Sequence, residues 1–180
     1  MALYRQTVED FGLYAGLELG EEQLSDLQEA ASRMSARMRA VRIVSASSVS
    51  KKDLESRLIH KGEDPAQAKE AVRWMEELAL IDDRKTADQV VERCVSKGYG
   101  IARARQALYE KRIPKALWEE VLEDYPDQTG KIASFMRSRL GENWDEKELK
   151  RVVDACLRRG HSYHDIRQAL ILLEADVYIV

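Results

Sequence analysis

The stretch Leu54-Glu-Ser-Arg-Leu-Ile-His-Lys-Gly62 decides the fold, because its pattern returns twice further along the chain. The counterparts are Ala104-Arg-Gln-Ala-Leu-Tyr-Glu-Lys-Arg112, which lies 50 residues later, and Val152-Val-Asp-Ala-Cys-Leu-Arg-Arg-Gly160, a further 48 residues on. Each copy has apolar residues at helical spacing and closes with a basic residue before a helix stop. Self-similarity at a period of this length indicates a helical repeat protein.

Each copy is followed by a second helical segment with apolar residues at matching offsets, namely Ala68, Trp118 and Ile166, then Val72, Leu122 and Leu170. Local signals mark the helix starts, since Ser50 with Asp53 and Ser162 with Asp165 form capping boxes. The sequence therefore predicts an all-α fold of three tandem three-helix repeats in an extended, curved array, with a short N-terminal helical extension. The expected division is an extension at 1–31 and repeats at 32–81, 82–125 and 126–180.

The composition limits the class of protein. The formal net charge of −3 argues against a protein that coats nucleic acid by bulk attraction, so any contact with a polyanion must be local. Cys94 and Cys156 lack the paired spacing of a zinc or redox motif and are expected to be reduced, buried thiols of a cytoplasmic protein. No signal peptide and no membrane span are expected, because no stretch of eighteen apolar residues occurs.

Charge separates by helix type. The second helix of the three repeats, at 51–61, 101–112 and 146–159, carries thirteen basic and six acidic residues, a net charge of +7. The third helix, at 66–78, 115–124 and 163–173, carries four basic and eight acidic residues, a net charge of −4. This partition predicts a basic and an acidic side in each repeat.

The middle repeat is the most basic, with nine basic and three acidic residues between Arg84 and Lys115. Arginine suits phosphate and carboxylate because its planar guanidinium makes paired hydrogen bonds. We expect partner binding by this repeat with help from the third, through Lys85, Arg93, Lys97, Arg103, Arg105, Arg112, Arg137, Arg139, Arg158 and Arg159.

Nothing in the sequence indicates catalysis, a cofactor or a bound metal. The spacing of His161, His164 and Asp165 would need further ligands to hold a metal, and a helix-capping role is the preferred interpretation. The serines of Ser47-Ser48-Val49-Ser50 have no histidine or aspartate placed to activate them. No glycine-rich phosphate loop is present, so ATP binding is not expected. The sequence therefore predicts a protein that is not an enzyme.

Three motifs resemble the RecX family when taken in order along the chain. Glu77-Leu-Ala-Leu-Ile-Asp-Asp83 is similar to the junction between its first two repeats. Lys97-Gly-Tyr-Gly100, followed by Arg103 and Arg105, is similar to its central motif, and Leu157-Arg-Arg-Gly160 is similar to its closing motif. The segment 12–30 resembles the N-terminal extension of Gram-positive members.

The chain departs from the family pattern at four positions. Glu63 and His161 stand where the family has an aromatic residue after the glycine that ends the helix. Thr86 also replaces an aromatic residue, and Arg112 replaces a glycine. We expect these changes to remove apolar packing.

The resemblance implies a regulator, mainly an inhibitor, of the RecA recombinase. Such a protein binds the groove of the RecA–DNA filament and limits filament extension, ATP hydrolysis and strand exchange. The implied partners are the RecA filament and single-stranded or filament-bound DNA, with no membrane, and the chain is expected to act as a monomer. Two alternatives remain open: a helix-turn-helix-like DNA-binding protein, which the acidic third helices disfavour, and a helical-repeat scaffold for another protein.

Overall fold

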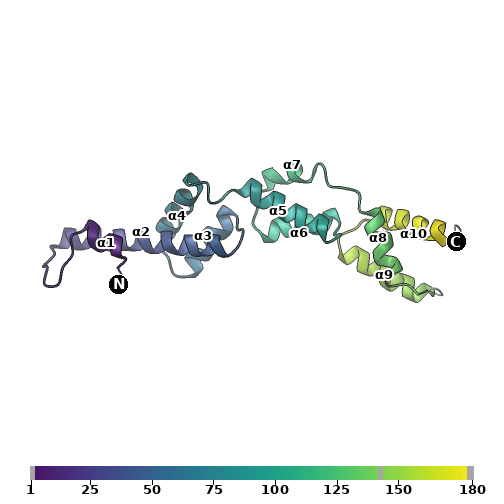
Figure 1. The fold of residues 1–180 in the computed structure, drawn as a ribbon, viewed down its shortest axis with the longest axis horizontal. Coiled ribbons are helices and arrows are strands. Elements are labelled where there is room, and N and C mark those ends of the chain that lie inside the picture. Colours follow the sequence, from purple (N-terminus) through teal and green to yellow (C-terminus); the bar gives the residue numbers. More distant parts are fainter. Residues whose placement is uncertain (1–2, 142–143, 178–180) are drawn as a thin grey trace. The chain divides into compact units, whose positions relative to one another are not determined.

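The computed structural model describes residues 3–141 and 144–177, and Figure 1 labels its helices. The chain divides into two compact units, residues 1–83 and 84–180. The first unit contains one buried core and the second contains two, and each unit is described by itself below.

The first unit is built on one long helix. Helix α2 (Glu21–Ala46) packs against α3 (Lys51–His60) and α4 (Pro65–Glu77), and the short helix α1 (Arg5–Asp10) also contacts α2 (Figure 1). The face of α2 toward α3 and α4 carries the small buried residues Ala36 and Ala40, which let the helices approach closely. The remaining core is aliphatic, with Leu54, Leu58, Ala68, Ala71, Val72 and Met75 at its centre.

Side chains fix the starts of α3 and α4, and at α3 this is the capping box that the sequence predicts. Ser50 Oγ accepts a hydrogen bond from the Asp53 amide at 3.1 Å, which satisfies one free N–H of the first turn of α3. Asp64 Oδ1 accepts from the amides of Ala66 and Gln67 at 2.8 and 3.1 Å, directly before the proline that begins α4. Between the two helices Gly62 has φ +89°, the left-handed conformation that ends α3.

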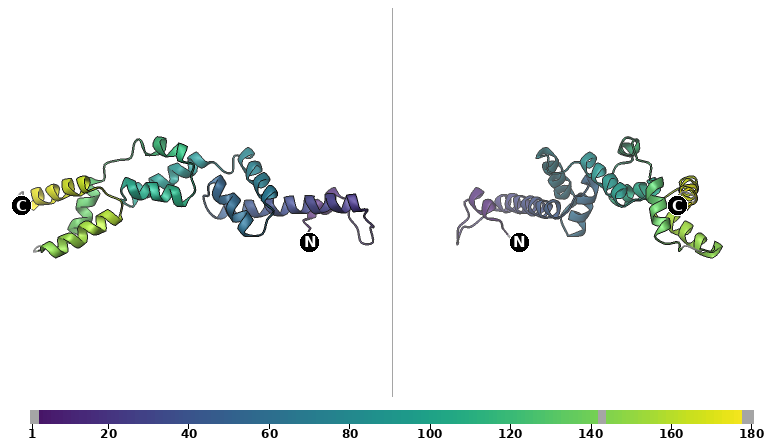
Figure 2. Two further views of the ribbon diagram at one scale, coloured as in Figure 1. Left: turned by 180° about the vertical axis from the view of Figure 1, so that it is seen from behind. Right: turned by 45° about the vertical axis from the view of Figure 1, so that its right-hand side comes forward.

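The second unit contains the remaining helices. They are α5 (Asp83–Ser96), α6 (Ile101–Glu110), a 3₁₀ turn η1 (Lys115–Leu117), α7 (Trp118–Leu122), α8 (Thr129–Arg137), α9 (Glu146–Arg158) and α10 (Tyr163–Val177). Helices α5, α6 and α7 enclose one core, formed by Ala87, Cys94, Ala104, Leu108, Val121 and Leu122. Helices α8, α9 and α10 enclose another, and α10 packs against both α8 and α9 (Figure 2).

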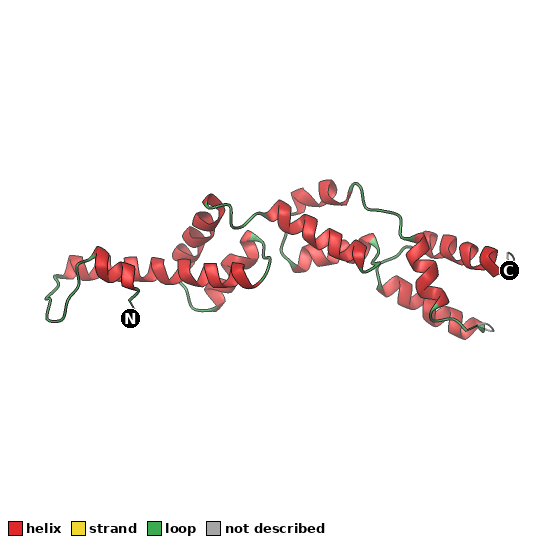
Figure 3. Cartoon of the chain, viewed as in Figure 1, coloured by secondary structure: helices red, strands yellow, loops and turns green. Residues whose placement is uncertain are grey.

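The all-α prediction is confirmed, because every regular element within residues 3–141 and 144–177 is a helix (Figure 3). The three helical cores correspond to the three predicted repeats. The division at 1–31, 32–81, 82–125 and 126–180 stays a proposal, and its first boundary falls inside the uninterrupted helix α2. No helix of the described residues is long and apolar enough to cross a bilayer.

Candidate functional site

Side chains from α8 and from the turn between α9 and α10 hold the turn between α5 and α6. Lys131 Nζ on α8 donates to the carbonyl of Val95 at 2.6 Å. His161 Nε2 lies 3.1 Å from the carbonyl oxygen of Gly98, which makes Nε2 the protonated nitrogen of the ring. The Lys131 ammonium group is favoured at this position, because the carbonyls at the end of a helix carry the negative end of its dipole.

Arg159 is the central side chain of these contacts. Its Nη2 donates to the carbonyl of Lys97 at 2.7 Å. Its guanidinium carbon lies 5.1 Å from the ring centre of Tyr99 and 4.6 Å from that of Phe135, within cation–π range of both rings. Tyr99 is fixed in turn, since its carbonyl accepts a 2.7 Å hydrogen bond from the Tyr125 hydroxyl. Burial raises the pKa of Tyr125 to about 12, so this hydroxyl keeps its proton and remains a donor.

Backbone contacts complete the connection. The Gly100 amide donates to the carbonyl of Arg159 at 2.9 Å, and the Ala102 amide donates to that of Gly160 at 3.3 Å. A Cβ on Gly100 would overlap the carbonyl oxygen of Gly160, and a Cβ on Gly160 would overlap the amide nitrogen of Arg103. We call this set of contacts between the α5–α6 turn (97–100) and the α9–α10 turn (159–162) the joint.

The joint brings together predicted site residues that are far apart in the sequence. Arg159, which follows α9, bonds to the carbonyl of Lys97, and the next residue, Gly160, lies against the backbone of Arg103. Arg139 joins them through Phe135, because its guanidinium carbon lies 5.3 Å from the centre of the ring that Arg159 also contacts.

Two of the gathered arginines are engaged within the chain. Arg159 is half-buried and bound to the joint, and Arg103 Nη1 forms an ion pair with Glu110 at 3.2 Å. Among the predicted site residues, four exposed side chains have no hydrogen-bond, ion-pair or ring contact within the described part of the chain, namely those of Arg93, Lys97, Arg105 and Arg158. These four are the predicted cations that a partner could bind without first breaking a contact.

The remaining predicted residues lie at the margins. Lys85 is exposed in the first part of α5, and Arg112 is exposed in the turn after α6. Arg137 ends α8 and is exposed. Four predicted residues, Lys97, Arg103, Arg139 and Arg159, therefore take part in the joint or adjoin it, whereas these three lie in other segments.

Sequence reasoning missed Lys131 and the structural role of His161. Burial lowers the pKa of His161, against the opposing effect of its hydrogen bond to Gly98, so the ring is held neutral. The family pattern could have indicated the structural role of His161. This residue stands where the family has an aromatic side chain, and such a position is usually buried. His161 is indeed buried, at 6% exposure.

Polar residues also occupy two other positions at which the chain departs from the family pattern. Glu63 is buried and pairs with Arg39 Nε at 2.7 Å, while Ser35 Oγ donates to its carboxylate at 3.0 Å. Thr86 is buried as well. The expectation that these changes simply remove packing was therefore incomplete, because hydrogen-bonded groups occupy the positions of Glu63 and His161.

The fold and the joint define a class of protein, a tandem helical repeat with exposed cations around the contact between two of its repeats. The sequence family described as RecX, second three-helix domain, matches residues 82–122, which carry α5, α6 and α7.

Individual relatives match longer stretches of this chain than the family model does. The chain is 27% identical to regulatory protein RecX of Vibrio parahaemolyticus serotype O3:K6 over 79% of this chain and 94% of the relative. It is 24% identical to regulatory protein RecX of Streptococcus sanguinis over 94% of this chain and 67% of the relative. The crystal structure of RecX from Lactobacillus salivarius has a similar fold, with a TM-score of 0.71 at 19% identity, covering 81% of this chain and 99% of that one. These matches confirm the resemblance to the RecX family that the motifs predicted.

Proposed function

We propose that the protein regulates a RecA recombinase, mainly as an inhibitor, by binding in the groove of the RecA–DNA filament. Bound there, it limits filament extension, ATP hydrolysis and strand exchange. The proposal is supported by the relatives, which are regulatory proteins called RecX. The observation that carries it is the set of exposed cations without a partner among the described residues, of which Arg93, Lys97 and Arg105 lie in the segment that matches the RecX domain and Arg158 lies in α9.

The proposed contact surface contains the exposed cations of the second and third repeats, namely Lys85, Arg93, Lys97, Arg105, Arg112, Arg137, Arg139 and Arg158. Arg103 and Arg159 act mainly through the joint, which they help to position. Phosphates of the filament DNA and carboxylates of RecA are both suitable ligands for guanidinium groups. Each phosphate contact would steepen the dependence of log K on log salt by about 0.7 to 0.9.

The mechanism we propose is binding alone, with no reaction catalysed by the chain. A regulator that occupies the filament groove needs rigid spacing between its contacts rather than a reactive group. The joint supplies such spacing, since it fixes the turn after α5 to the end of α9 through backbone and side-chain hydrogen bonds. We expect no cofactor requirement and action as a monomer.

The third helix of the middle repeat argues against sequence reading by a helix-turn-helix. In such a motif the second helix of the pair enters the major groove and is basic or rich in amides. Helix α7 has only five residues and carries the exposed acids Glu119 and Glu120. Glu120 is also paired with Arg84 of α5.

The test is a RecA assay with the purified chain. RecA is assembled on single-stranded DNA, and ATP hydrolysis is followed as the chain is added. Inhibition at a ratio well below one chain per RecA supports the proposal, because a groove-bound blocker stops growth of a whole filament. An unchanged rate at saturating chain, combined with tight binding to one defined duplex sequence, would instead support a DNA-reading protein.

A further inference from the structure

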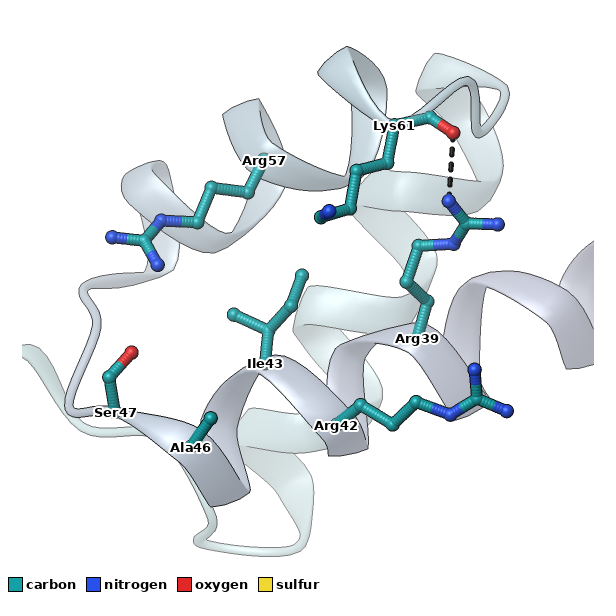
Figure 4. A pocket seen from close by; sticks show the side chains of 7 residues that line it. All are labelled: Arg39, Arg42, Ile43, Ala46, Ser47, Arg57 and Lys61. Atoms are coloured by element: carbon teal, nitrogen blue, oxygen red, sulfur yellow. Dashed lines mark hydrogen bonds between the residues drawn. The ribbon is translucent and has the colours of Figure 1, made fainter.

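The first unit contains an open pocket that the proposed function does not use. It has a volume of about 430 Å³ and is lined by Arg39, Arg42, Ile43, Ala46, Ser47, Arg57 and Lys61. Helix α2 supplies one wall, and α3 with the residue that follows it supplies the other (Figure 4). Four of the seven lining residues are cationic and none is acidic.

Two of the four cations are neutralised by acids outside the lining. Arg39 pairs with the buried carboxylate of Glu63 at 2.7 Å, and Arg57 pairs with Asp53 at 2.9 Å. Within the described residues, the side chains of Arg42 and Lys61 have no such partner. The pocket therefore carries two uncompensated positive charges.

The cations are spread along the pocket rather than directed at one point. Figure 4 shows the guanidinium groups of Arg39 and Arg42 on one side, that of Arg57 on the other, and the Lys61 side chain extending between them. Ile43 lies in the middle, and Ala46 and Ser47 follow it toward the end of α2. The Lys61 carbonyl holds Arg39 in place through a 2.8 Å hydrogen bond from Nη1.

We propose that this pocket binds a short stretch of a single nucleic-acid strand, with Arg42 and Lys61 each contacting a backbone phosphate. Separated cations fit successive phosphates better than one small anion, which would require convergent donors. The apolar centre formed by Ile43 and Ala46 suits the sugar and base edges between them. This is a second contact, in the first unit, and it does not rest on the proposed action on RecA.

The experiment uses the full chain and DNA alone, so its failure is distinct from failure of the RecA proposal. Binding of a fluorescein-labelled oligothymidylate is measured by anisotropy over a series of salt concentrations. The test variant is Arg42→Gln with Lys61→Gln, which removes both unpaired charges and leaves the Lys61 carbonyl in place. We expect about ten- to thirtyfold weaker binding near 0.1 M salt, and a salt slope lower by about 1 to 1.5.

The matched control is Lys69→Gln with Arg73→Gln. These residues are exposed cations of α4 in the same unit, outside the pocket lining, and their loss changes the net charge equally. We expect the control to bind within about threefold of the unaltered chain, because charges outside the site are screened. Equal losses in both variants would overturn the proposal, since binding would then depend on net charge.

Competition identifies the ligand chemistry. The unlabelled oligothymidylate should displace the probe from the unaltered chain, whereas a methylphosphonate strand of the same sequence should not. Displacement by polyglutamate as effectively as by DNA would overturn the assignment in favour of an acidic protein segment. Full displacement by millimolar inorganic phosphate would overturn it in favour of a site for a single ion. Circular dichroism of each variant establishes that it is folded.

Discussion

Gly100 and Gly160 meet backbone to backbone, so closely that a Cβ on Gly100 would overlap the carbonyl oxygen of Gly160. Only residues without a side chain allow this approach. The two glycines come from the turns that follow α5 and α9, and thus from different repeats. The distance between the cations on either side of the joint is therefore set by the backbone.

Substitution of Gly100 should loosen the joint. Gly100→Ala places a methyl group against backbone atoms that cannot rotate away, so the turns must separate. We expect the free energy of unfolding to fall by about 1–3 kcal/mol, as measured by urea denaturation.

Gly130→Ala is the matched control for this change. Gly130 lies in the first turn of α8, and a Cβ there meets nothing within 4 Å. Alanine is the better helix former, so the control should gain about 0.5–1 kcal/mol. A Gly100→Ala chain as stable as the Gly130→Ala chain would show that the close approach is absent in solution.

Acidification should weaken the joint through His161. Burial holds the pKa of this ring below its ordinary value of 6.5, so the unfolded chain takes up a proton before the folded chain does. The contribution of His161 is present above about pH 6.5 and is lost as the pH falls from there toward the lower folded pKa.

The comparison is between urea midpoints at pH 7.5 and 5.5. His161→Gln should show a smaller loss of stability between these pH values than the unaltered chain. His164→Gln is the control, because it removes an imidazole that is exposed on α10 and takes no part in the joint contacts described above. An identical loss in all three chains would refute the assignment of the titration to His161.

The pair of Arg39 and Glu63 should respond unequally to removal of either member. The Glu63 side chain is 6% exposed and that of Arg39 is 38% exposed. Arg39→Ala leaves a buried carboxylate with only Ser35 as a donor, and we expect a loss of about 3 kcal/mol. Glu63→Ala leaves a guanidinium that water can reach and that still binds the Lys61 carbonyl, with a loss of about 1 kcal/mol. Equal losses in thermal or urea unfolding would contradict the unequal burial of the pair.

Arg112 stands in the left-handed region with φ +54°, where the family has a glycine. Arg112→Gly and Arg112→Ala both remove the side chain, but only glycine relieves the backbone. We expect the glycine variant to be more stable than the alanine variant by about 1 kcal/mol. Both should reduce RecA inhibition to the same degree, so a difference between them in that assay would point to a backbone effect rather than to the lost cation.

Periodicity and helix-capping residues predicted most of the fold. Ser50 and Ser162 begin helices as expected, since their hydrogen bonds depend only on neighbours within three residues. The ends of the weaker helices were less predictable. The third helix expected over 115–124 begins with the 3₁₀ turn Lys115–Leu117 and ends at Leu122.

The site was only partly predictable, because a sequence gives the positions of cations but not their partners. The sequence does not distinguish Arg93 from Arg159, because both are arginines near the end of a helix. Arg93 is exposed and unpaired among the described residues, whereas Arg159 contacts two aromatic rings. Nothing in the sequence indicated the role of Lys131, because this role depends on the Val95 carbonyl, which lies 36 positions away. Such contacts form only after the repeats have packed.

The central claim is most directly tested by the potency of charge-reversal variants in the RecA assay. Arg93→Glu with Arg105→Glu should raise the concentration that halves RecA ATP hydrolysis by about tenfold, with unchanged thermal stability. The control is Lys115→Glu with Arg167→Glu, which reverses two exposed cations in η1 and α10 and should keep the potency of the unaltered chain. Full potency of the Arg93 and Arg105 variant, or an equal loss in the control, would contradict the proposed contact surface.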